Sequence, residues 1–381
     1  MYTIVNDFPN EMIYKELEPC VSLYQTTHRH GPDNKSDHIV YKHLLQQIEE
    51  SLTQKYKRIN VMPIVNFFQE IKDDADFWMH TLDGMAILAN QTQCIVYLLN
   101  CPVEDGVFVA DGFHIRPLIQ YFQTANTYGL LGLGSKSISL FEGNRYDVKQ
   151  IEISEEIANE IVAINCEEHE DGFLTHGRYG GADGIATFHG HGGRKDAIGK
   201  DQERFFRYVD KAVLESFSKI RKVPLILVSL EEHQGEFRKI SNNPYLLPEG
   251  IEMSYEALDL DQMTKKAWEI MEPLFFNKIQ AMVDRYRSAS ANALGSDKLS
   301  EIARVVAENN VETIFVEADR IIPGRFEAQT GNLELDSIDD PAHGDVIDQI
   351  VKAVMKNKGE VVVLPPEKMP TDTGLAVIYR Y

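Results

Sequence analysis

A glycine-rich stretch in the middle of the chain, residues 175–195, most constrains how this chain can fold. Its sequence is THGRYGGADGIATFHGHGGRK, with seven glycines and three histidines in 21 residues. Glycine loses the most backbone entropy on ordering and adds no side chain to a core. The stretch therefore predicts a loop that takes unusual backbone angles or approaches another surface closely. A charged amphipathic helix over 201–217 is expected to anchor it.

The composition excludes several classes of protein. At 381 residues, 43% of them hydrophobic, the chain can bury sizeable cores and is expected to hold two or three domains. No apolar run approaches the roughly 20 residues that cross a bilayer, and the first residues lack the pattern of a signal peptide. We therefore expect a soluble, cytoplasmic protein with no membrane partner. Its four scattered cysteines predict reduced thiols, not a structural zinc site.

The charge is strongly negative overall but locally positive. A net charge of −21 argues against nonspecific affinity for nucleic acid, because phosphates would be repelled. From Arg194 to Lys222, however, nine Lys and Arg residues face five Asp and Glu residues. This basic segment is consistent with binding an anion at one defined place. A solvated helix face is the alternative.

The pattern of apolar residues predicts three domains of α/β class, over 1–125, 126–253 and 254–381. The expected strands are 20–24, 93–99, 106–110, 130–133, 137–142, 148–153, 224–230, 312–316, 360–364 and 375–379. The expected helices are 37–56, 201–217, 254–287, 299–308 and 345–356, and 77–89 is predicted as helix or loop. Pro273 is expected to kink or divide the third helix, and Ser296 to cap the fourth. The acidic stretch 334–345 predicts an exposed loop.

Two polar segments resemble functional motifs. Residues 132–137, GLGSKS, lack the adjacent Gly-Lys of a phosphate loop and the crossover helix of a dinucleotide site, so they predict a turn. Residues 26–31, TTHRHG, concentrate hydrogen-bond donors after a strand. Strand ends often carry function, but a polar turn is the favoured interpretation.

The histidines of the glycine-rich stretch raise the question of a metal. His189 and His191 would face one side of a strand, and His176, His169 or Asp183 would complete a ligand shell. No HExxH or similar spacing is present. Local hydrogen bonding is the favoured role, and we predict neither a metal nor a cofactor.

Six segments occur in an order that resembles a known family. They are PCVSLYQTTHRHGPD (19–33), FWMHTLDGMAIL (77–88), FHIRPLIQ (113–120), LGLGSKSISLFEGNRY (131–146), HGHGGRKDAIGKDQERFFRYVDKAV (189–213) and MPTDTGLAVIYRY (369–381). Together they resemble the bacterial branch of the archaeo-eukaryotic peptide-release-factor and Pelota superfamily. The resemblance implies a divergent N-terminal α/β domain, a central RNase H-like domain, and a C-terminal α/β/α sandwich like the kink-turn-binding ribosomal proteins.

One departure from that family bears on activity. Release factors carry a Gly-Gly-Gln loop before a long helix, and the resemblance places Gly192 and Gly193 there, followed by Arg194. A guanidinium has no hydrogen-bond acceptor and cannot position water as the glutamine does, although it can grip phosphate. Hydrolytic termination is therefore not expected. The Asn-Ile-Lys-Ser motif that reads stop codons is absent as well.

The resemblance implies a ribosome-associated factor acting in rescue, quality control or dormancy, with ribosomal or transfer RNA as partner. The residues expected to contact RNA are His189, His191, Gly192, Gly193, Arg194, Lys195, Arg204, Arg207 and Lys211. It also implies a translational GTPase docking on the C-terminal domain. Two alternatives stay open: a metal-dependent hydrolase that uses the histidine loop, and a protein–protein adaptor.

Overall fold

The computed structural model describes residues 1–15, 17–124, 127–167, 192–335 and 344–381, with the backbone alone for 165–167 and 192–200. The chain forms two compact units. Unit 1 combines Met1–Thr124 with Phe276–Tyr381, and unit 2 is Ala125–Phe275. The prediction of three domains stays a prediction. Among the described helices, none is both long and apolar enough to cross a membrane.

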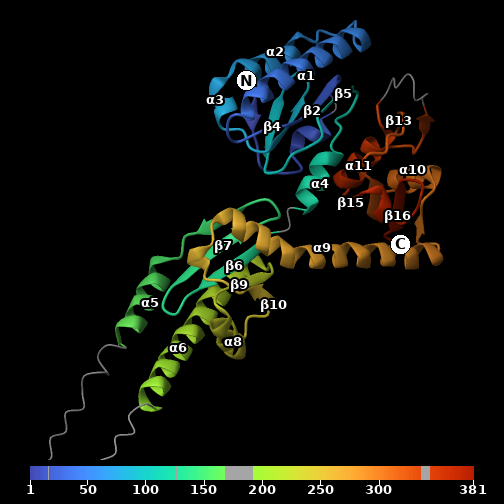
Figure 1. Cartoon of the computed structure of the whole chain (residues 1–381). Helices are drawn as coiled ribbons and strands as arrows, with labels where there is room; N and C mark the ends of the chain where they lie inside the picture. The colour runs from blue at the N-terminus through green and yellow to red at the C-terminus, as the bar shows by residue number, and fades with distance from the viewer. Residues whose placement is uncertain (16, 125–126, 168–191, 336–343) are drawn as a thin grey trace, which may run out of the picture. The chain divides into compact units, whose positions relative to one another are not determined.

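The N-terminal part of unit 1 is a five-stranded mixed sheet with helices on one face (Figure 1). Its strand order is β1 (Thr3–Ile4), β4 (Cys94–Leu99), β3 (Gly84–Ala89), β2 (Cys20–Thr26) and β5 (Gly106–Ala110), antiparallel except for the β1–β4 pair. The covering helices are α1 (Asn34–Lys55), α2 (Met62–Asp73) and α3 (Ala75–Met79). The short 3-10 helix η1 spans Glu11–Tyr14.

The sequence pattern misses two strands of this sheet, the short β1 and the longer β3. The prediction of helix or loop over 77–89 is wrong from Gly84 onward, where the chain runs between β2 and β4. Every residue of β3 is buried, so its run of Met, Ala, Ile and Leu shows no alternation. Periodicity alone cannot distinguish such a strand from a buried helix.

The C-terminal part of unit 1 is a four-stranded sheet that shares a hydrophobic core with two helices. The strands lie in the order β11 (Gly295–Ser296), β16 (Leu375–Tyr379), β12 (Val311–Glu317) and β15 (Glu360–Leu364), and only β12 and β15 are parallel. The remaining elements are α10 (Leu299–Ala307), α11 (Val346–Lys356), the hairpin β13 (Gly324–Phe326) and β14 (Leu333–Leu335), and η4 (Pro366–Lys368). The predicted strands and helices are confirmed here within a residue or two. The N-cap of α10 is Lys298, however, not Ser296.

The two parts of unit 1 share one hydrophobic core. Alternate side chains of β2 enter different cores: Val21 and Leu23 pack with α1 and α2, whereas Tyr24 joins Ile350 and Val377 of the C-terminal part. Helix α4 (Arg116–Thr124) lies beside edge strand β15. There the Gln123 side chain accepts from the Val363 N–H at 2.7 Å and donates to its C=O at 3.1 Å. The first and last thirds of the chain thus fold around each other.

Unit 2 is a five-stranded mixed sheet covered on both faces. Its strands lie in the order β10 (Leu246–Ile251), β9 (Leu225–Val228), β6 (Tyr128–Leu133), β7 (Ile138–Gly143) and β8 (Val148–Ile151). Strands β10, β9 and β6 run parallel to one another, whereas β7 runs antiparallel to both of its neighbours, β6 and β8. One face packs against α5 (Glu155–Glu167), α6 (Gly192–Val213) and α8 (Glu231–Ile240), and the other against the start of α9 (Leu260–Ala291). The short helices η2 (Leu214–Ser218, a π-helix), α7 (Lys219–Arg221) and η3 (Tyr255–Ala257) complete the unit.

Helices α6 and α9 differ most from their predicted bounds. Helix α6 begins at Gly192, nine residues before the predicted start, so Gly192 to Lys195 form its first turn. Helix α9 runs without interruption from Leu260 to Ala291 with Pro273 inside it. Of the two effects predicted for Pro273, division of the helix is therefore wrong, and a kink stays a prediction. Burial of one α9 face in each unit compensates for the single hydrogen bond that proline cannot make.

Candidate functional site

The residues expected to contact RNA fall into two groups in the structure. His189 and His191, with His169, His176 and Asp183 of the metal alternative, lie outside the described residues. Gly192, Gly193, Arg194 and Lys195 form the first turn of α6 and do not belong to a loop. Arg204, Arg207 and Lys211 follow on the same helix.

Helix α6 presents Arg204, Arg207 and Lys211 on one exposed face. They are spaced by three and four residues, which places side chains one above another along a helix. All three are exposed. Arg207 is held by Glu203 one turn earlier, through Nη2–Oε1 at 2.6 Å and Nε–Oε1 at 3.0 Å. The structure therefore brings three of the predicted residues together as a cationic row.

The opposite face of α6 fixes this row to a rigid body. Phe205, Phe206 and Val209 are buried against β6 residues and Phe237 of α8. The buried carboxylate of Asp210 accepts from the Asn242 N–H at 2.9 Å and from the Ser241 hydroxyl. Because apolar packing and a buried hydrogen-bonded acid both hold this helix, the face that carries the cations keeps a defined orientation in unit 2.

The GLGSKS motif is structural. Gly132 lies in β6, where a Cβ atom would come within 2.5 Å of the Tyr255 ring. Gly134 donates its N–H to the Ser137 carbonyl at 2.8 Å, closing the β6–β7 turn. The prediction of a turn is confirmed, and the glycine at 132 is explained by close packing of an aromatic side chain.

The polar loop after β2 uses its side chains to hold itself together. Thr26 and Thr27 donate their hydroxyls to the Val103 and Leu82 carbonyls. His28 binds Asp37 through Nδ1 at 2.7 Å, and this hydrogen bond raises the pKa of His28. These contacts favour the predicted polar turn.

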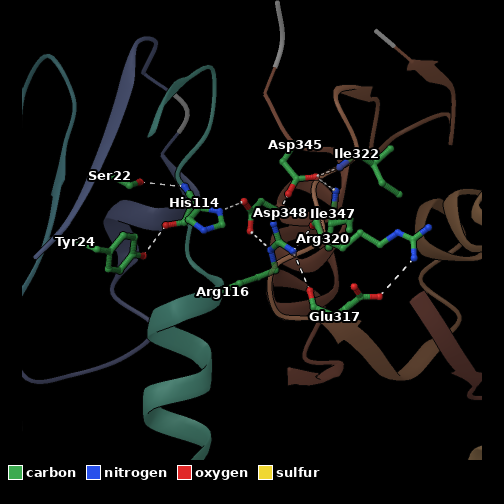
Figure 2. A network of polar contacts seen from close by, with 10 residues as sticks. All are labelled: Ser22, Tyr24, His114, Arg116, Glu317, Arg320, Ile322, Asp345, Ile347 and Asp348. Carbon is green, nitrogen blue, oxygen red and sulfur yellow. Dashed lines mark hydrogen bonds and ion pairs between the residues drawn. The ribbon is translucent and has the colours of Figure 1, made fainter. Parts of the chain in front are cut away.

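A buried cluster of charged side chains lies elsewhere, in unit 1. It consists of His114 and Arg116 from the N-terminal part and Asp345 and Asp348 at the start of α11 (Figure 2). Asp348 accepts from Arg116 Nε at 3.2 Å and faces His114 Nδ1 at 2.5 Å. Asp345 accepts from Arg116 Nη2. Arg116 also donates Nη1 to the carbonyl oxygens of Glu317, at 2.9 Å, and of Arg320.

Burial sets the electrostatics of this cluster. Arg116 is 1% exposed, and neither aspartate side chain exceeds 9%. Burial and the neighbouring charge of Asp348 raise the pKa of Asp345 to about 6 against the pull of Arg116. Burial also acts on Asp348, but the charges and hydrogen bonds of His114 and Arg116 outweigh it and hold the pKa of Asp348 below its usual range. One guanidinium thus balances two carboxylates in a desolvated site.

The cluster also offers ligand atoms in a spacing that suits a metal. One donor atom each from His114, Asp345 and Asp348 lies within 4.8 Å of the others. Arg116, however, already contacts both carboxylates, and its charge takes the place a divalent cation would have. A metal would have to displace a buried arginine with five donors, so the donor set fits a salt-bridge network better than a metal centre.

Sequence reasoning missed this cluster, and it predicted Asp345 as part of an exposed acidic loop. That prediction is wrong for Asp345, which is the N-cap of α11 and accepts from the Ile347 N–H. The available signal was an arginine between apolar residues, at 113–119, which is unusual unless the charge is paired. Nothing in the spacing indicated that its partners lie more than two hundred residues later.

The units and their sheets define a multidomain α/β protein with several mixed sheets. Residues 127–310 match the Bacterial archaeo-eukaryotic release factor family 3. The resemblance to the bacterial branch of this superfamily, predicted from six sequence segments, is thereby confirmed for these residues. Comparison with curated protein sequences gave no match.

Several solved structures resemble the chain weakly. The archaeal translation termination factor aRF1 has 14% identity and a TM-score of 0.26, over 97% of this chain and 95% of that one. Dom34 of S. cerevisiae, a translation termination-like factor involved in RNA quality control and interacting with Hbs1, has 9% identity and a TM-score of 0.37, over 78% and 74%. Archaeoglobus fulgidus Pelota has 11% identity and a TM-score of 0.31, over 78% and 79%. Superpositions this weak carry no argument about function.

Proposed function

We propose that the protein acts in translation as a ribosome-associated, release-factor-like or Pelota-like factor, in rescue, quality control or dormancy. The observation that carries this proposal is the combination of the family match over 127–310 with the cationic row on α6, inside the matched segment. A strongly acidic body with one positively charged helix face suits docking at a single RNA site, because stray phosphate contacts are repelled.

We infer that unit 2 is the RNase H-like domain implied by the resemblance. When the strands of unit 2 are numbered 1 to 5 along the chain, from β6 to β10, their order in the sheet is 3-2-1-4-5. The first three are antiparallel, and the fourth and fifth continue parallel to the first. Helix α6 lies on one face of this sheet and carries the segment that corresponds to the Gly-Gly-Gln region.

The proposed role does not include hydrolysis of peptidyl-tRNA. Arg194 replaces the glutamine, and its guanidinium has no acceptor with which to position water. In our proposal Gly192, Gly193, Arg194 and Lys195 approach RNA together with His189 and His191. Arg204, Arg207 and Lys211 then hold phosphate from the helix.

Sedimentation with ribosomes tests the proposal. Full-length protein is run on sucrose gradients with purified ribosomes at several salt concentrations, as wild type and as Arg204→Gln/Arg207→Gln/Lys211→Gln. The matched control is Lys219→Gln/Arg221→Gln/Lys222→Gln, which removes the same charge from the far end of the same helical segment. We expect the first triple variant alone to lose binding, and the slope of log K against log salt to fall by about 2–3.

Two results would contradict the proposal. Protein that stays at the top of every gradient would exclude ribosome binding under those conditions. Equal loss in both triple variants would show that net charge alone matters and that the α6 row is not a docking surface. A peptidyl-tRNA hydrolysis assay gives a separate check, in which wild type is expected to be inactive.

The resemblance also suggests a translational GTPase as partner of the C-terminal part of unit 1. This extension is tested by pull-down from nuclease-treated lysate with wild type and the α6 triple variant. Capture of a GTPase by both would support an adaptor role that does not depend on RNA.

A further inference from the structure

Unit 1 contains a cavity of about 200 Å³ that none of the functions above uses. Its wall includes residues of α1, β5 and α11 and of the loop between β5 and α4. Apolar side chains form much of this wall, among them Val107, Phe108, Phe113 and Ile321. An apolar cavity of about 150 Å³ is known to hold a benzene molecule, so this volume suits one aromatic ring with a substituent.

With a neutral imidazole at His114, the formal charges on the wall cancel. Two lysines and two aspartates line the cavity, namely Lys55, Lys352, Asp345 and Asp348. Both aspartates already accept from Arg116, in the buried network described above. Lys55 donates Nζ to the Val109 carbonyl at 3.1 Å, and Lys352 likewise already interacts with another group. An ion that left water for this wall would gain no net attraction, so the cavity favours a neutral molecule.

Two polar groups of the wall remain open, on His114 and Ser51. The His114 backbone donates its N–H to the Ser22 hydroxyl at 3.0 Å and accepts from the Tyr24 hydroxyl at 2.6 Å, while Nδ1 contacts Asp348 (Figure 2). No described residue makes a hydrogen bond to His114 Nε2 or to the Ser51 hydroxyl. Neither atom is among the buried polar atoms that lack a partner, so both reach accessible space.

The imidazole of His114 presents a hydrogen-bonding atom beside an aromatic surface. Its ring stacks on Phe108 at 3.9 Å between centroids, and both rings line the cavity. Because Nδ1 faces a carboxylate, the neutral ring carries its hydrogen there, and Nε2 is an acceptor. Protonation of the ring would make Nε2 a donor. A hydroxyl group both donates and accepts, so it suits Nε2 in either state.

From these observations we infer that the cavity binds a small neutral phenol, one aromatic ring that bears a hydroxyl group. The ring lies among Phe108, Phe113 and Ile321, and the hydroxyl forms a hydrogen bond with Nε2 of His114. A ring without the hydroxyl fills the same space but leaves Nε2 unpaired. The inference does not rest on the proposed role in translation, because the cavity belongs to unit 1 and the α6 row to unit 2.

Titration calorimetry on the full-length protein tests this inference with three probes. Phenol carries the ring and the hydroxyl, toluene carries the ring alone, and benzoate carries a ring with a negative charge. The cavity variant is Ser51→Phe, which places a ring where the ligand would lie. Its matched control is Gln54→Phe, which adds the same ring at an exposed position of α1 outside the cavity wall.

We expect saturable binding of phenol, weaker by about tenfold or more in Ser51→Phe and unchanged in Gln54→Phe. A third variant, His114→Asn, separates the hydrogen bond from the space, because asparagine keeps an N–H donor but has no atom in the place of Nε2. It should weaken phenol by about three- to tenfold and toluene by less. Benzoate should bind more weakly than phenol to the wild type. Circular dichroism checks that each variant is folded.

Three results would overturn the inference. They are no saturable binding of phenol up to about 5 mM, equal loss of phenol affinity in Ser51→Phe and Gln54→Phe, and benzoate binding as tightly as phenol. Equal loss of phenol and toluene affinity in His114→Asn would overturn the role of the hydroxyl, because it would show that His114 only shapes the cavity.

Discussion

At the scale of single residues, Arg116 is the buried cation that contacts both carboxylates of the cluster. It is the one cation between two buried carboxylates, and it satisfies two backbone carbonyls as well. Arg29 makes a similar fork on the surface, to Asp83 at 2.8 and 3.0 Å, with both side chains 37% exposed. Comparing the two arginines shows how much burial changes the contribution of an arginine–aspartate pair to stability.

We expect Arg116→Met to lower the free energy of unfolding by about 3–5 kcal/mol, because it leaves two carboxylates buried without their cation. Arg29→Met should cost about 0.2–1 kcal/mol, as is typical of solvent-exposed pairs. Denaturation by urea, followed by circular dichroism, measures both. Similar small losses in the two variants would mean that the buried network is solvated in solution.

The raised pKa of Asp345 predicts an unusual pH dependence. Its folded-state pKa, about 6, lies above the unfolded value of 3.8, so the folded state binds this proton more tightly. Its contribution to stability is present at low pH and is lost as the pH rises through about 6. Asp348 behaves oppositely, since its lowered pKa gives stability that is lost as the pH falls.

Asp345→Asn tests this prediction because asparagine resembles the protonated carboxyl and does not titrate. The stability of wild type relative to the variant should fall by about 1–3 kcal/mol between pH 4 and pH 7. Urea midpoints across this range, with Asp83→Asn as the exposed control, measure the difference. A constant difference would show that Asp345 is ionised throughout.

At the scale of elements, close packing explains a glycine that resembles part of a phosphate loop. A Cβ atom at position 132 would meet the Tyr255 ring, which lies over β6. At Gly235, inside α8, a Cβ atom would meet nothing within 4 Å. The same substitution should therefore have opposite effects at the two positions.

We expect Gly132→Ala to destabilise the protein by about 1–3 kcal/mol through overpacking. Gly235→Ala should stabilise it by about 0.5–1 kcal/mol, because alanine is the better helix former. Thermal unfolding compares them. Destabilisation by both would indicate that backbone flexibility, not space, requires glycine.

The elements also show how far the sequence could predict the molecule. Strands with one clear apolar run, such as β5 and β15, and the amphipathic helix α11 are predicted closely because local pattern decides them. Strand β3 is missed because burial on both faces removes its alternation. The row on α6 follows from helical spacing, whereas the cluster around Arg116 depends on contacts between the two ends of the chain, which no local pattern records.

At the scale of the whole molecule, unit 2 is an insertion within unit 1. The core that packs the N-terminal sheet includes Ile350 and Val377, from beyond the inserted unit. We expect an isolated fragment 1–124 to unfold several kcal/mol more easily than unit 1, because Tyr24 and its neighbours lose their cover. A fragment 125–275 should keep the midpoint it has in the full chain, because both of its cores are internal.

Hydrogen exchange of β2 and β4 amides in the full chain and in fragment 1–124 measures this difference. Protection in the fragment equal to that in the full chain would show that the helices α1 and α2 alone stabilise the sheet, through the second core. Loss of protection limited to the fragment would establish that unit 1 folds as one cooperative body.

The insertion has a consequence for synthesis of the protein. Strand β16, Leu375–Tyr379, is translated after the whole of unit 2, yet it belongs to the core that covers β2, β3 and β4. Unit 2 can complete its fold while the chain is still being elongated. The N-terminal sheet must wait, with one apolar face uncovered, until α11 and β16 have been made, and a nascent chain in that state is a natural client for chaperones.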